Sequence, residues 1–508
     1  MTTPCFLAID LGTTQAKAGL VGLDGRLLAL ARAAYPLETD GASGAAEQDP
    51  ADWWAAIRAM TAELLATAGP VELRAIGIDG HGPTLVAAAA DGRPIHRAIT
   101  WMDGRVGAEE ADLGAATGQA GWVLGILPRA LWVERNLPAA GDARWYLASW
   151  EWVGLRLTGI AAETSLPGQV HPDRDRVAQT GLATDRIPPR VATASVLGPL
   201  VPGPAAELGL PAGIPVVAGM ADAHASFVGA GLLEHGDAID TGGTSGGFAV
   251  YTDRPIEIPG VFGAAAPIAG RWFLGGAMNA TGKALDWLRD DILGSAVRTD
   301  ELLAEAMAVA PGADGLVFLP YLAGERSPIW DPAARGAFVG LTLRHRRAHL
   351  TRAVLEAADL ALRHVAAPIV TAGVPVRELR VSGGLARERD LNRLKADVTG
   401  FLVAVPAIVE TALVGSAIAA GTGIGAFSDL ADGIRAIVRI EDRIEPDPAF
   451  ASTYTALFSA YVELYPALRP TFGRLAAMDA EAAPSAAVGA APAGPPGSAA
   501  AATPEARA

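Results

Sequence analysis

The sequence predicts an α/β protein made of two related domains, and three observations carry this prediction. The chain of 508 residues is too long for one hydrophobic core. Apolar segments of strand length alternate with helical patterns, and clusters of polar residues follow the strands. An aspartate followed by glycine and paired hydroxyl residues stands between two strands twice, at Asp10 and again at Asp240. We place the domains at residues 1–236 and 237–475, with a tail at 476–508.

The bulk composition excludes several classes of protein. A net charge of −15 and a pI near 5.0 argue against a nucleic-acid partner. Hydrophobic residues make up 51% of the chain, but alanine is the most frequent of them. No run of about 18 strongly apolar residues appears without a charged residue or a proline, so we expect no membrane span. No signal peptide is evident. The single cysteine, Cys5, excludes intrachain disulfides and Cys-rich zinc sites and fits a reducing cytoplasm.

The first hairpin is the segment most suggestive of ligand binding. Residues 6–9 are apolar and predict a buried strand that ends at Asp10. Gly12 allows a sharp reversal, and Thr13 and Thr14 add hydroxyl and N–H groups before the chain returns as a second strand. Such a turn can donate to phosphate oxygens while the carboxylate faces a cation. An ordinary hairpin turn remains the alternative for this stretch alone.

The pattern then alternates between helix and strand. Asp49 caps a helix whose apolar residues recur from Trp53 to Leu64. A strand over 73–78 delivers the polar cluster 79–83 at its end, and another strand leads to Trp101–Arg105. This alternation indicates an α/β domain with polar clusters at the ends of strands, where ligands usually bind.

The middle of the chain completes the first domain. Amphipathic helical pieces are expected over 132–136 and 145–157, followed by a Pro- and Gly-rich connector over 165–213. A short strand at 216–218 leads to Asp222 and a helix of small residues. Asp222 could serve merely as the cap of that helix.

The second hairpin repeats the first. An apolar strand ends at Asp240, glycines and the hydroxyls of Thr244 and Ser245 follow, and a return strand runs over 248–251. Two such turns indicate a duplicated domain and are far more specific than either alone. Facing one cleft, they would hold a nucleotide polyphosphate from both sides.

The last third adds two further glycine-rich segments. A strand from Leu379 enters the Gly383–Gly384 turn, where missing side chains would let a ring or ribose approach the backbone. A small-residue helix from Thr411 to Ala417 offers the same opportunity. In residues 479–508, 22 of 30 are Ala, Pro or Gly, which predicts a disordered tail.

Taken together, these segments resemble the FGGY carbohydrate kinases, most closely their xylulokinase-like pentulose branch. The resemblance extends from about Phe6 to about Arg474, and its most specific part is Gly336–Glu356, which fits the C-terminal signature of the family. The other matching segments are Asp10–Thr14, Glu47–Pro50, Trp101–Arg105, Ala218–Asp222, Gly243–Gly246, Leu319–Arg326 and Ser382–Gly384.

The resemblance implies two actin-like ATPase domains of the ribonuclease H-like type, with ATP as the phosphoryl donor and a sugar or polyol as the acceptor in a cleft between them. Mg²⁺ would be held by Asp10 through its water shell. Asp222 would be the catalytic base that accepts the proton of the attacking hydroxyl. The implied phosphate contacts are Thr13, Thr14, Gly243, Thr244 and Ser245, and the implied adenosine contacts are Gly383, Gly384 and Ala412.

The acceptor side departs from the family pattern. Similar pentulose kinases carry Gly-Gln-Met-His-Gly where this chain has Gly80–Thr84, and the Arg-Glu pair of glycerol kinases is absent too. We expect His81 and Asp103 to contact the substrate, although His81 could simply fill a turn. Arg129 replaces the usual lysine of the N-terminal signature. The favoured acceptor is a ketopentose such as xylulose, with a tetritol, a glycerol-like polyol or a ketohexose as alternatives.

Other classes fit less well. A non-catalytic actin-like ATPase module would keep both phosphate hairpins but would not need Asp222. A sugar-responsive repressor would need a DNA-binding extension, whereas this chain begins in its first strand. Related zinc-bearing sugar kinases are disfavoured because only Cys5 is present. From the single cysteine we expect a cytoplasmic enzyme, and a homodimer stays open.

Overall fold

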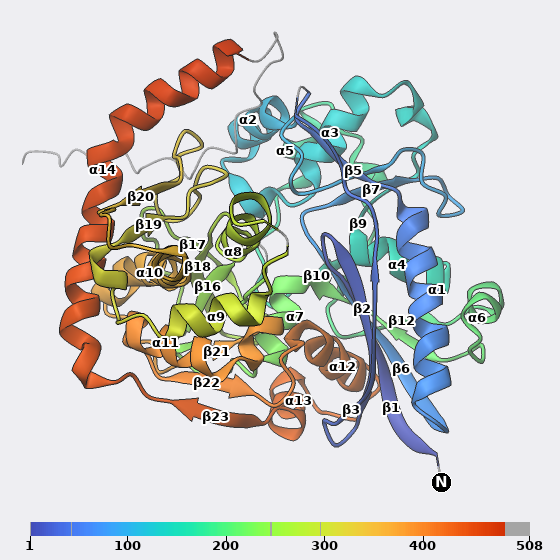
Figure 1. Ribbon diagram of the computed structural model, residues 1–508. Coiled ribbons are helices and arrows are strands. Elements are labelled where there is room, and N and C mark those ends of the chain that lie inside the picture. Colours follow the sequence, from blue (N-terminus) through green and yellow to red (C-terminus); the bar gives the residue numbers. More distant parts are fainter. Residues whose placement is uncertain (1, 42, 244–245, 295, 483–508) are drawn as a thin grey trace, which may run out of the picture.

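Two mixed β-sheets, one from each half of the chain, organise the fold (Figure 1). The computed structural model describes residues 2–41, 43–243, 246–294 and 296–482. The N-terminal sheet has the order β12-β13-β6-β1-β2-β3, and β14 pairs with β6 beyond β13. Its strands are β1 (Thr3–Leu11), β2 (Gln15–Gly22), β3 (Leu27–Ala34), β6 (Val71–Gly80), β12 (Val196–Pro199), β13 (Pro215–Val217) and β14 (Met220–Ala221).

The C-terminal sheet has the order β17-β18-β16-β15-β21-β22-β23. Its strands are β15 (Asp237–Asp240), β16 (Gly247–Thr252), β17 (Phe262–Ala265), β18 (Trp272–Ala277), β21 (Glu378–Val381), β22 (Val403–Pro406) and β23 (Ile440–Ile444).

The two sheets share one pairing pattern. In each, three neighbouring strands pair antiparallel, namely β1-β2-β3 and β15-β16-β18. The first strand of each trio then pairs parallel with a later strand, β6 or β21, which pairs parallel with β13 or β22. The predicted duplication is therefore visible in the topology of the fold.

A helix from the opposite half of the chain covers one face of each sheet. In the N-terminal sheet, α1 (Pro50–Thr67) covers one face with Trp53, Ile57 and Met60. The other face packs against α12 (Thr411–Gly423), which belongs to the C-terminal half. In the C-terminal sheet, α10 (Arg347–Thr371) covers one face, and α7 (Asp222–Gly229) from the N-terminal half packs Phe227 against the other.

The helices α7 and α12 cross in backbone contact. A Cβ atom added at Gly229 would lie 1.7 Å from the carbonyl oxygen of Thr411, and one added at Gly415 would lie 1.9 Å from the carbonyl oxygen of Ala225. Only glycine allows the two helices to approach this closely. The crossing joins the two halves at α7, the helix that begins with Asp222.

We expect Gly229→Ala to destabilise the protein by about 1–3 kcal/mol, because the new methyl group must push the two helices apart. A fall in the urea midpoint of unfolding, followed by circular dichroism, measures this effect. The matched control is Gly473→Ala in α14, where an added Cβ meets nothing within 4 Å. That control should be neutral or slightly stabilising, and equal midpoints for the two variants would contradict the close crossing.

A smaller sheet extends the N-terminal half, in the order β4-β5-β8-β7-β9. Its strands are β4 (Glu38–Asp40), β5 (Ala45–Gln48), β7 (Leu85–Ala88), β8 (Ala98–Ile99) and β9 (Trp145–Ala148), and the two-stranded pairs are β10 (Glu163–Ser165) with β11 (Arg190–Ala192) and β19 (Val317–Leu319) with β20 (Ala337–Val339). The remaining helices are α2 (Gly107–Thr117), α3 (Leu127–Asn136), α4 (Ser149–Thr158), α5 (Arg174–Ala178), α6 (Pro202–Leu208), α8 (Lys283–Trp287), α9 (Thr299–Met307), α11 (Arg389–Thr399), α13 (Leu430–Ile437) and α14 (Ala451–Ala482). None of the helices in the described ranges is both long enough and apolar enough to span a lipid bilayer.

Three sequence predictions need correction. The helix expected over 145–157 begins only at Ser149, because residues 145–148 pair with β7 as strand β9. The connector expected over 165–213 contains α5, α6 and the edge strand β12. Residues 476–482 of the predicted disordered tail continue α14, which runs along the outer side of the C-terminal half (Figure 1). The rest of that tail lies outside the described residues.

Candidate active site

Three aspartates meet at the carboxyl ends of neighbouring strands in the N-terminal sheet. The parallel register of β1 and β6 places Asp10 opposite Asp79. The short strand β14 continues alongside β6, with Met220 opposite Asp79, and Asp222 follows it as the first residue of α7. The fold therefore gathers three carboxyl groups from segments about 70 and 140 residues apart in sequence, as expected of a ligand site at strand ends.

Burial disfavours the charged forms of the carboxyl groups in this cluster. Asp10 and Asp79 are 6% and 0% exposed, and Oδ1 of Asp79 is buried with no hydrogen-bond partner among the described residues. Burial raises the pKa of both, and the charge of Asp10 raises that of Asp79 further. Lys17, at 3.9 Å from the Asp10 carboxylate, is the cation that opposes this effect on Asp10.

Asp222 is partly exposed and has a strongly shifted pKa. Burial of its carboxyl group, together with the charge of Asp10, raises this pKa to about 7. The N–H of Ala223, which donates to Oδ1 of Asp222 over 2.7 Å, opposes the shift. Asp222 thus has the proton affinity that a general base needs near neutral pH.

The first hairpin is fixed through its carbonyl groups. The hydroxyl of Tyr35 donates to the carbonyl oxygen of Gly12, and the amide of Gln48 donates to that of Thr13 over 2.7 Å. A Cβ atom at Gly12 would lie 2.8 Å from the carbonyl oxygen of Gln15, so the turn requires glycine. Within the described part of the chain, no hydrogen-bond acceptor is found for the backbone N–H groups of residues 12–14. These groups are free to bind an anion.

The two halves also meet over Trp101. Its indole N–H donates to the hydroxyl of Thr13 over 2.9 Å. The guanidinium of Arg326, from the C-terminal half, lies 5.3 Å from the centre of the indole ring. The Nε–H group of Arg326 donates to Oδ1 of Asn279 over 2.8 Å, which fixes the guanidinium. Trp101 thereby links the first hairpin to the opposite half of the chain.

The second hairpin contacts the predicted adenosine turn through its backbone. Gly242 and Gly243 have φ angles of +59° and +85°, and a Cβ at Gly242 would lie 2.3 Å from the carbonyl oxygen of Ser382. A Cβ at Gly383 would meet only the amide nitrogen of Gly243, at 3.7 Å, and one at Gly384 would meet nothing within 4 Å. Open space therefore borders this turn. Thr244 and Ser245, predicted phosphate contacts, lie outside the described residues.

Ala412 lies close to the same turn. The hydroxyls of Ser382 and Thr411 share a hydrogen bond of 2.6 Å, and the amide of Gly383 donates to the carbonyl oxygen of Val409. The start of α12 is thus tied to the Gly383–Gly384 turn. The structure brings together the predicted adenosine contacts and Gly243.

A buried ion triad supports the second hairpin from behind. Lys395 of α11 lies 2.8 Å from a carboxylate oxygen of Asp240 and also pairs with Asp359 of α10. The other oxygen of Asp240 accepts the amide hydrogen of Gly242 over 2.9 Å. The two carboxylates raise the pKa of Lys395, and burial raises that of Asp359 to about 6. The triad fixes the turn at the point where Asp240 enters it.

The predicted substrate contacts are enclosed by protein. His81 is 1% exposed, its Nδ1 shares a hydrogen bond of 2.8 Å with Thr84, and its ring meets that of Trp53 edge to face at 5.5 Å. Burial lowers the pKa of this imidazole to about 3, so the ring is neutral. Nε2 is buried with no hydrogen-bond partner among the described residues. This geometry favours the turn-filling role, and a substrate contact by His81 stays a prediction.

Asp103 is engaged in a similar way. Its carboxylate accepts from the amide of Ala46 over 2.9 Å and from the guanidinium of Arg105, which also pairs with Glu47. Arg129 is buried and donates to the carbonyl oxygens of Thr100 and Trp101. These side chains fix the loop that presents Trp101. A direct contact of Asp103 with the substrate also stays a prediction.

Asp79 is the site residue that the sequence analysis missed. Its second oxygen accepts the hydroxyl of Ser416 from α12 over 2.6 Å, so it also ties the two halves together. A signal was present, because Asp79 ends a strand in the same way as Asp10 does. What the sequence could not show was the register that brings the two side chains together.

The residues present fit the cofactors implied by the family resemblance. The free N–H groups at residues 12–14 and the open space at Gly243 and Gly384 suit a polyphosphate with its nucleoside. Two buried carboxyl groups on neighbouring strands, with Oδ1 of Asp79 lacking a described hydrogen-bond partner, suit Mg²⁺, which takes few protein ligands and keeps several waters. Across the described ranges, no group of three or more His, Cys, Asp or Glu side chains is arranged to hold a metal ion by itself.

Comparison with known proteins identifies the class of this fold and site. Residues 5–229 match the profile of the N-terminal domain, and residues 240–424 that of the C-terminal domain, of the FGGY family of carbohydrate kinases. A xylulose kinase structure from Rhodospirillum rubrum is 33% identical with a TM-score of 0.78, covering 92% of this chain and all of that one. A glycerol kinase structure from Plasmodium falciparum with ADP, 18% identical, shares the fold with a TM-score of 0.76 over 91% of this chain and 98% of that one.

Two further relatives extend the match along the sequence. A gluconokinase from Bacillus subtilis is 28% identical over 93% of this chain and 98% of its own length. A xylulose kinase from Escherichia coli is 31% identical over 78% of this chain and 85% of its own length. Fold and site thus define an ATP-dependent phosphotransferase that acts on an alcohol group. The chain belongs to the FGGY family of carbohydrate kinases, which confirms the predicted family and two-domain fold.

Proposed function

We propose that this enzyme transfers the terminal phosphoryl group of ATP to a hydroxyl group of a ketopentose such as xylulose. The identity of 33% to the xylulose kinase of R. rubrum, over nearly the full length of both chains, carries this proposal. The 31% identity to the E. coli xylulose kinase supports it. The gluconokinase of B. subtilis, at 28% over 93% of the chain, makes gluconate the main competing acceptor.

In this proposal Asp222 is the general base. It lies at the end of β14, beside the Asp10–Asp79 pair and at the start of α7, where the two halves meet. Its raised pKa lets the carboxylate take the proton of the attacking hydroxyl near neutral pH. The positive end of the α7 dipole steadies the carboxylate form before that transfer.

The other predicted residues are assigned to the donor. Asp10, with Asp79 beside it, would hold Mg²⁺, which would neutralise charge on the phosphate groups. The N–H groups of Thr13 and Thr14 and those of the second hairpin would hold phosphate oxygens, with Thr244 and Ser245 as its hydroxyls. Gly383, Gly384 and Ala412 would border the adenosine. In this proposal both hairpins face one cleft between the halves, and closure of that cleft would exclude water from the reacting phosphate.

The proposal is tested by ADP release in the presence of a panel of acceptors. The panel holds ketopentoses, ketohexoses, tetritols, glycerol and gluconate, each measured against the Asp222→Asn variant as background. We expect the highest kcat/KM with a ketopentose. A higher kcat/KM with gluconate would overturn the substrate assignment. If no acceptor raises ADP release above that of the Asp222→Asn variant, the kinase mechanism is overturned.

We further infer that the enzyme works in the cytoplasm, because the single Cys5 is buried and needs no oxidising compartment. A homodimer stays a proposal, with sedimentation velocity as its measurement.

A further inference from the structure

The guanidinium of Arg326 has no counter-charge at its place between the two halves. Arg326 is half-buried in the C-terminal half, beyond the end of β19. Its Nε–H donates to Oδ1 of Asn279 over 2.8 Å, and its Nη2 donates to the carbonyl oxygen of Met278 over 3.0 Å. Among the described residues, no acceptor is found for Nη1, and no carboxylate lies within ion-pair distance of the guanidinium. Arg326 therefore keeps both a free charge and free N–H donors.

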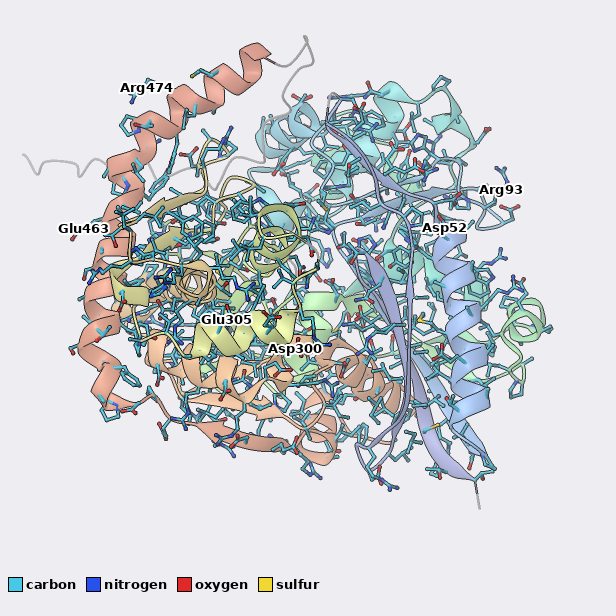
Figure 2. The ribbon with its side chains drawn as sticks, in the orientation of Figure 1. Asp52, Arg93, Asp300, Glu305, Glu463 and Arg474 are labelled. Carbon is cyan, nitrogen blue, oxygen red and sulfur yellow. The ribbon has the colours of Figure 1, made fainter. Side chains whose placement is uncertain are left out.

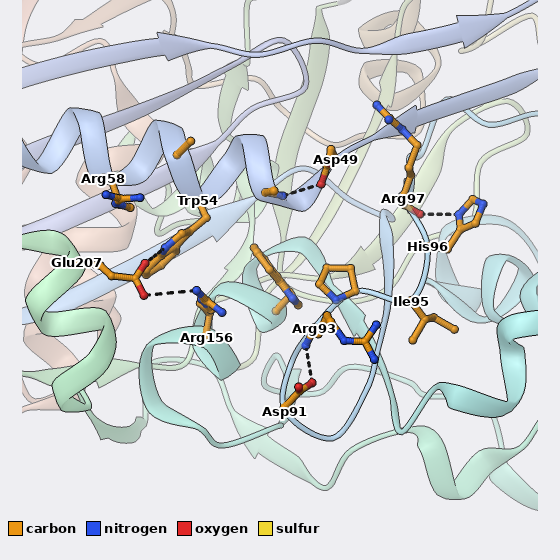
Figure 3. A pocket seen from close by; sticks show the side chains of 14 residues that line it. Asp49, Trp54, Arg58, Asp91, Arg93, Ile95, His96, Arg97, Arg156 and Glu207 are labelled. Atoms are coloured by element: carbon orange, nitrogen blue, oxygen red, sulfur yellow. Dashed lines mark hydrogen bonds and ion pairs between the residues drawn. The ribbon is translucent and has the colours of Figure 1, made fainter.

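Other arginines of the chain have an acidic partner. Arg347 pairs with Glu305 of α9, which lies in the C-terminal half (Figure 2). Arg156 pairs with Glu207 over 3.5 Å where both line a cavity of about 790 Å³ on the N-terminal half (Figure 3). Charged groups that are removed from water are usually paired in this way, because an isolated buried charge is destabilising. Arg326 departs from this arrangement and can offer its charge to a bound anion.

Both hairpins are linked to this guanidinium. The amide of Met278, whose carbonyl oxygen accepts from Arg326, donates to the carbonyl oxygen of Gly246 in the second hairpin over 3.3 Å. On the other side, the guanidinium lies 5.3 Å from the ring centre of Trp101, and the indole N–H of Trp101 donates to the hydroxyl of Thr13 in the first hairpin. One residue on each side thus connects Arg326 to a hairpin.

The neighbouring acid, Glu325, does not supply the missing charge. It is 4% exposed, and one carboxyl oxygen accepts the amide hydrogens of Asn279 and Arg326 over 2.7 and 2.8 Å. The other oxygen is buried with no hydrogen-bond partner in the described ranges. Burial raises the pKa of Glu325 to about 8, so this group keeps its proton near neutral pH. Glu325 therefore fixes the backbone that carries Arg326 and leaves the guanidinium charge in place.

We propose that Arg326 is a catalytic residue that binds the phosphoryl group while it passes from ATP to the acceptor. This inference rests on the proposed function, in which both hairpins hold phosphate oxygens. The bond from the γ-phosphorus to the bridging oxygen of ADP breaks as the bond to the acceptor oxygen forms, and the acceptor proton passes to Asp222. Arg326 keeps its protons throughout. Its free N–H groups donate to the phosphoryl oxygens and stabilise their negative charge.

The test compares wild type with Arg326→Ala, using the acceptor that gives the highest kcat/KM in the panel. We expect kcat to fall by about 10²–10³-fold with little change in the KM for ATP, because the lost donor acts mainly in the transition state. Guanidinium chloride at a non-denaturing concentration should restore part of this kcat. Arg326→Lys keeps the charge but not the planar fork, so its kcat should lie between the two. It carries the same comparison if Arg326→Ala does not fold.

Binding of a transition-state analogue gives a readout that a purely structural role would not change. ADP with Mg²⁺, aluminium fluoride and the acceptor imitates the phosphoryl group in transfer. Calorimetric titration should show at least about tenfold weaker binding of this mixture to Arg326→Ala than to wild type. Titration with ADP alone should give the same affinity for both proteins.

Arg363→Ala on α10 is the matched control. Arg363 is also half-buried, also lacks a carboxylate within ion-pair distance across the described structure, and lies 4.5 Å from the ring centre of Phe458. It donates to the carbonyl oxygen of Tyr454 in α14 and has no link to either hairpin. This control should keep the kcat of wild type, which isolates the position of Arg326 as the cause of any loss.

Four results would overturn the inference: wild-type kcat in Arg326→Ala, no recovery with guanidinium, equal weakening of ADP and of the analogue, or a loss confined to gluconate. The last result would assign Arg326 to the carboxylate of an acceptor. Failure of the proposed function is distinguishable, because wild type itself would then release no additional ADP with any acceptor.

Discussion

The Asp222→Asn variant should lose phosphoryl transfer by about 10²–10⁴-fold in kcat, because a carboxamide cannot accept the proton of the attacking hydroxyl. It should retain ADP binding, since the proposed nucleotide contacts lie on the two hairpins and the Gly383–Gly384 turn. Initial rates of ADP release and calorimetric titration with ADP measure the two quantities. The Asp52→Asn control removes an acidic residue from the first turn of α1 instead.

The stability of Asp222→Asn separates a lost base from a damaged fold. The folded pKa of Asp222, about 7, lies above the ordinary aspartate value of 3.8. When folding raises the pKa of a carboxyl group, the protonated group contributes its full stability below the unfolded pKa. This contribution to the free energy of unfolding is lost as pH rises through the folded pKa. Asparagine carries no charge, so at pH above about 7 the variant should be at least as stable as wild type. Near-wild-type turnover in a stable Asp222→Asn variant would refute the base assignment.

The Lys395→Met variant should destabilise the protein by about 3–5 kcal/mol near neutral pH, because it leaves two buried carboxylates without their cation. Asp240 and Asp359 have side chains only 12% and 5% exposed. Chemical unfolding in urea measures the loss. Lys283→Met, at an exposed lysine of α8, is the control and should change stability little.

The pH dependence of this loss gives a second measurement. The pKa of Asp359 is already raised to about 6 with Lys395 in place, and removing the cation raises it further. The stability that depends on the protonated carboxyl is present at low pH and lost as pH rises through that folded pKa. The penalty of Lys395→Met should therefore be smaller near pH 5 than near pH 8. An equal penalty at both values would show that the triad does not act through charge.

Local sequence patterns predicted the two hairpins because their signals are local. The Asp-Leu-Gly-Thr-Thr turn, the capping Asp49 and the helix of small residues after Thr411 all depend on neighbours within a few positions. Family resemblance added the roles of residues such as Asp222, which no spacing rule provides. Those roles remain predictions, while the geometry shows that Asp10 and Asp222 lie in one carboxylate cluster.

The features that escaped prediction depend on distant partners. Lys395 lies on an amphipathic helix and is typical of a solvent-exposed residue, yet it pairs with Asp240, which lies 155 residues earlier. Residues 145–148 form a strand only because β7 offers a free edge. The helix α12 is apolar or small on most sides, which indicates burial but not the sheet against which it packs.

The exchange of α7 and α12 between the sheets has a consequence for how the protein can be divided. Each half contributes a helix that packs on the sheet of the other half, so neither half forms a complete hydrophobic core by itself. A fragment ending at residue 236 would leave Phe6, Ala8 and Val217 uncovered, and its partner fragment would leave Ile239 and Tyr251 uncovered. The family profiles divide the chain between residues 229 and 240, but the molecule is interlocked across that boundary. Co-expression of the two fragments, rather than either alone, is the arrangement that would restore both cores.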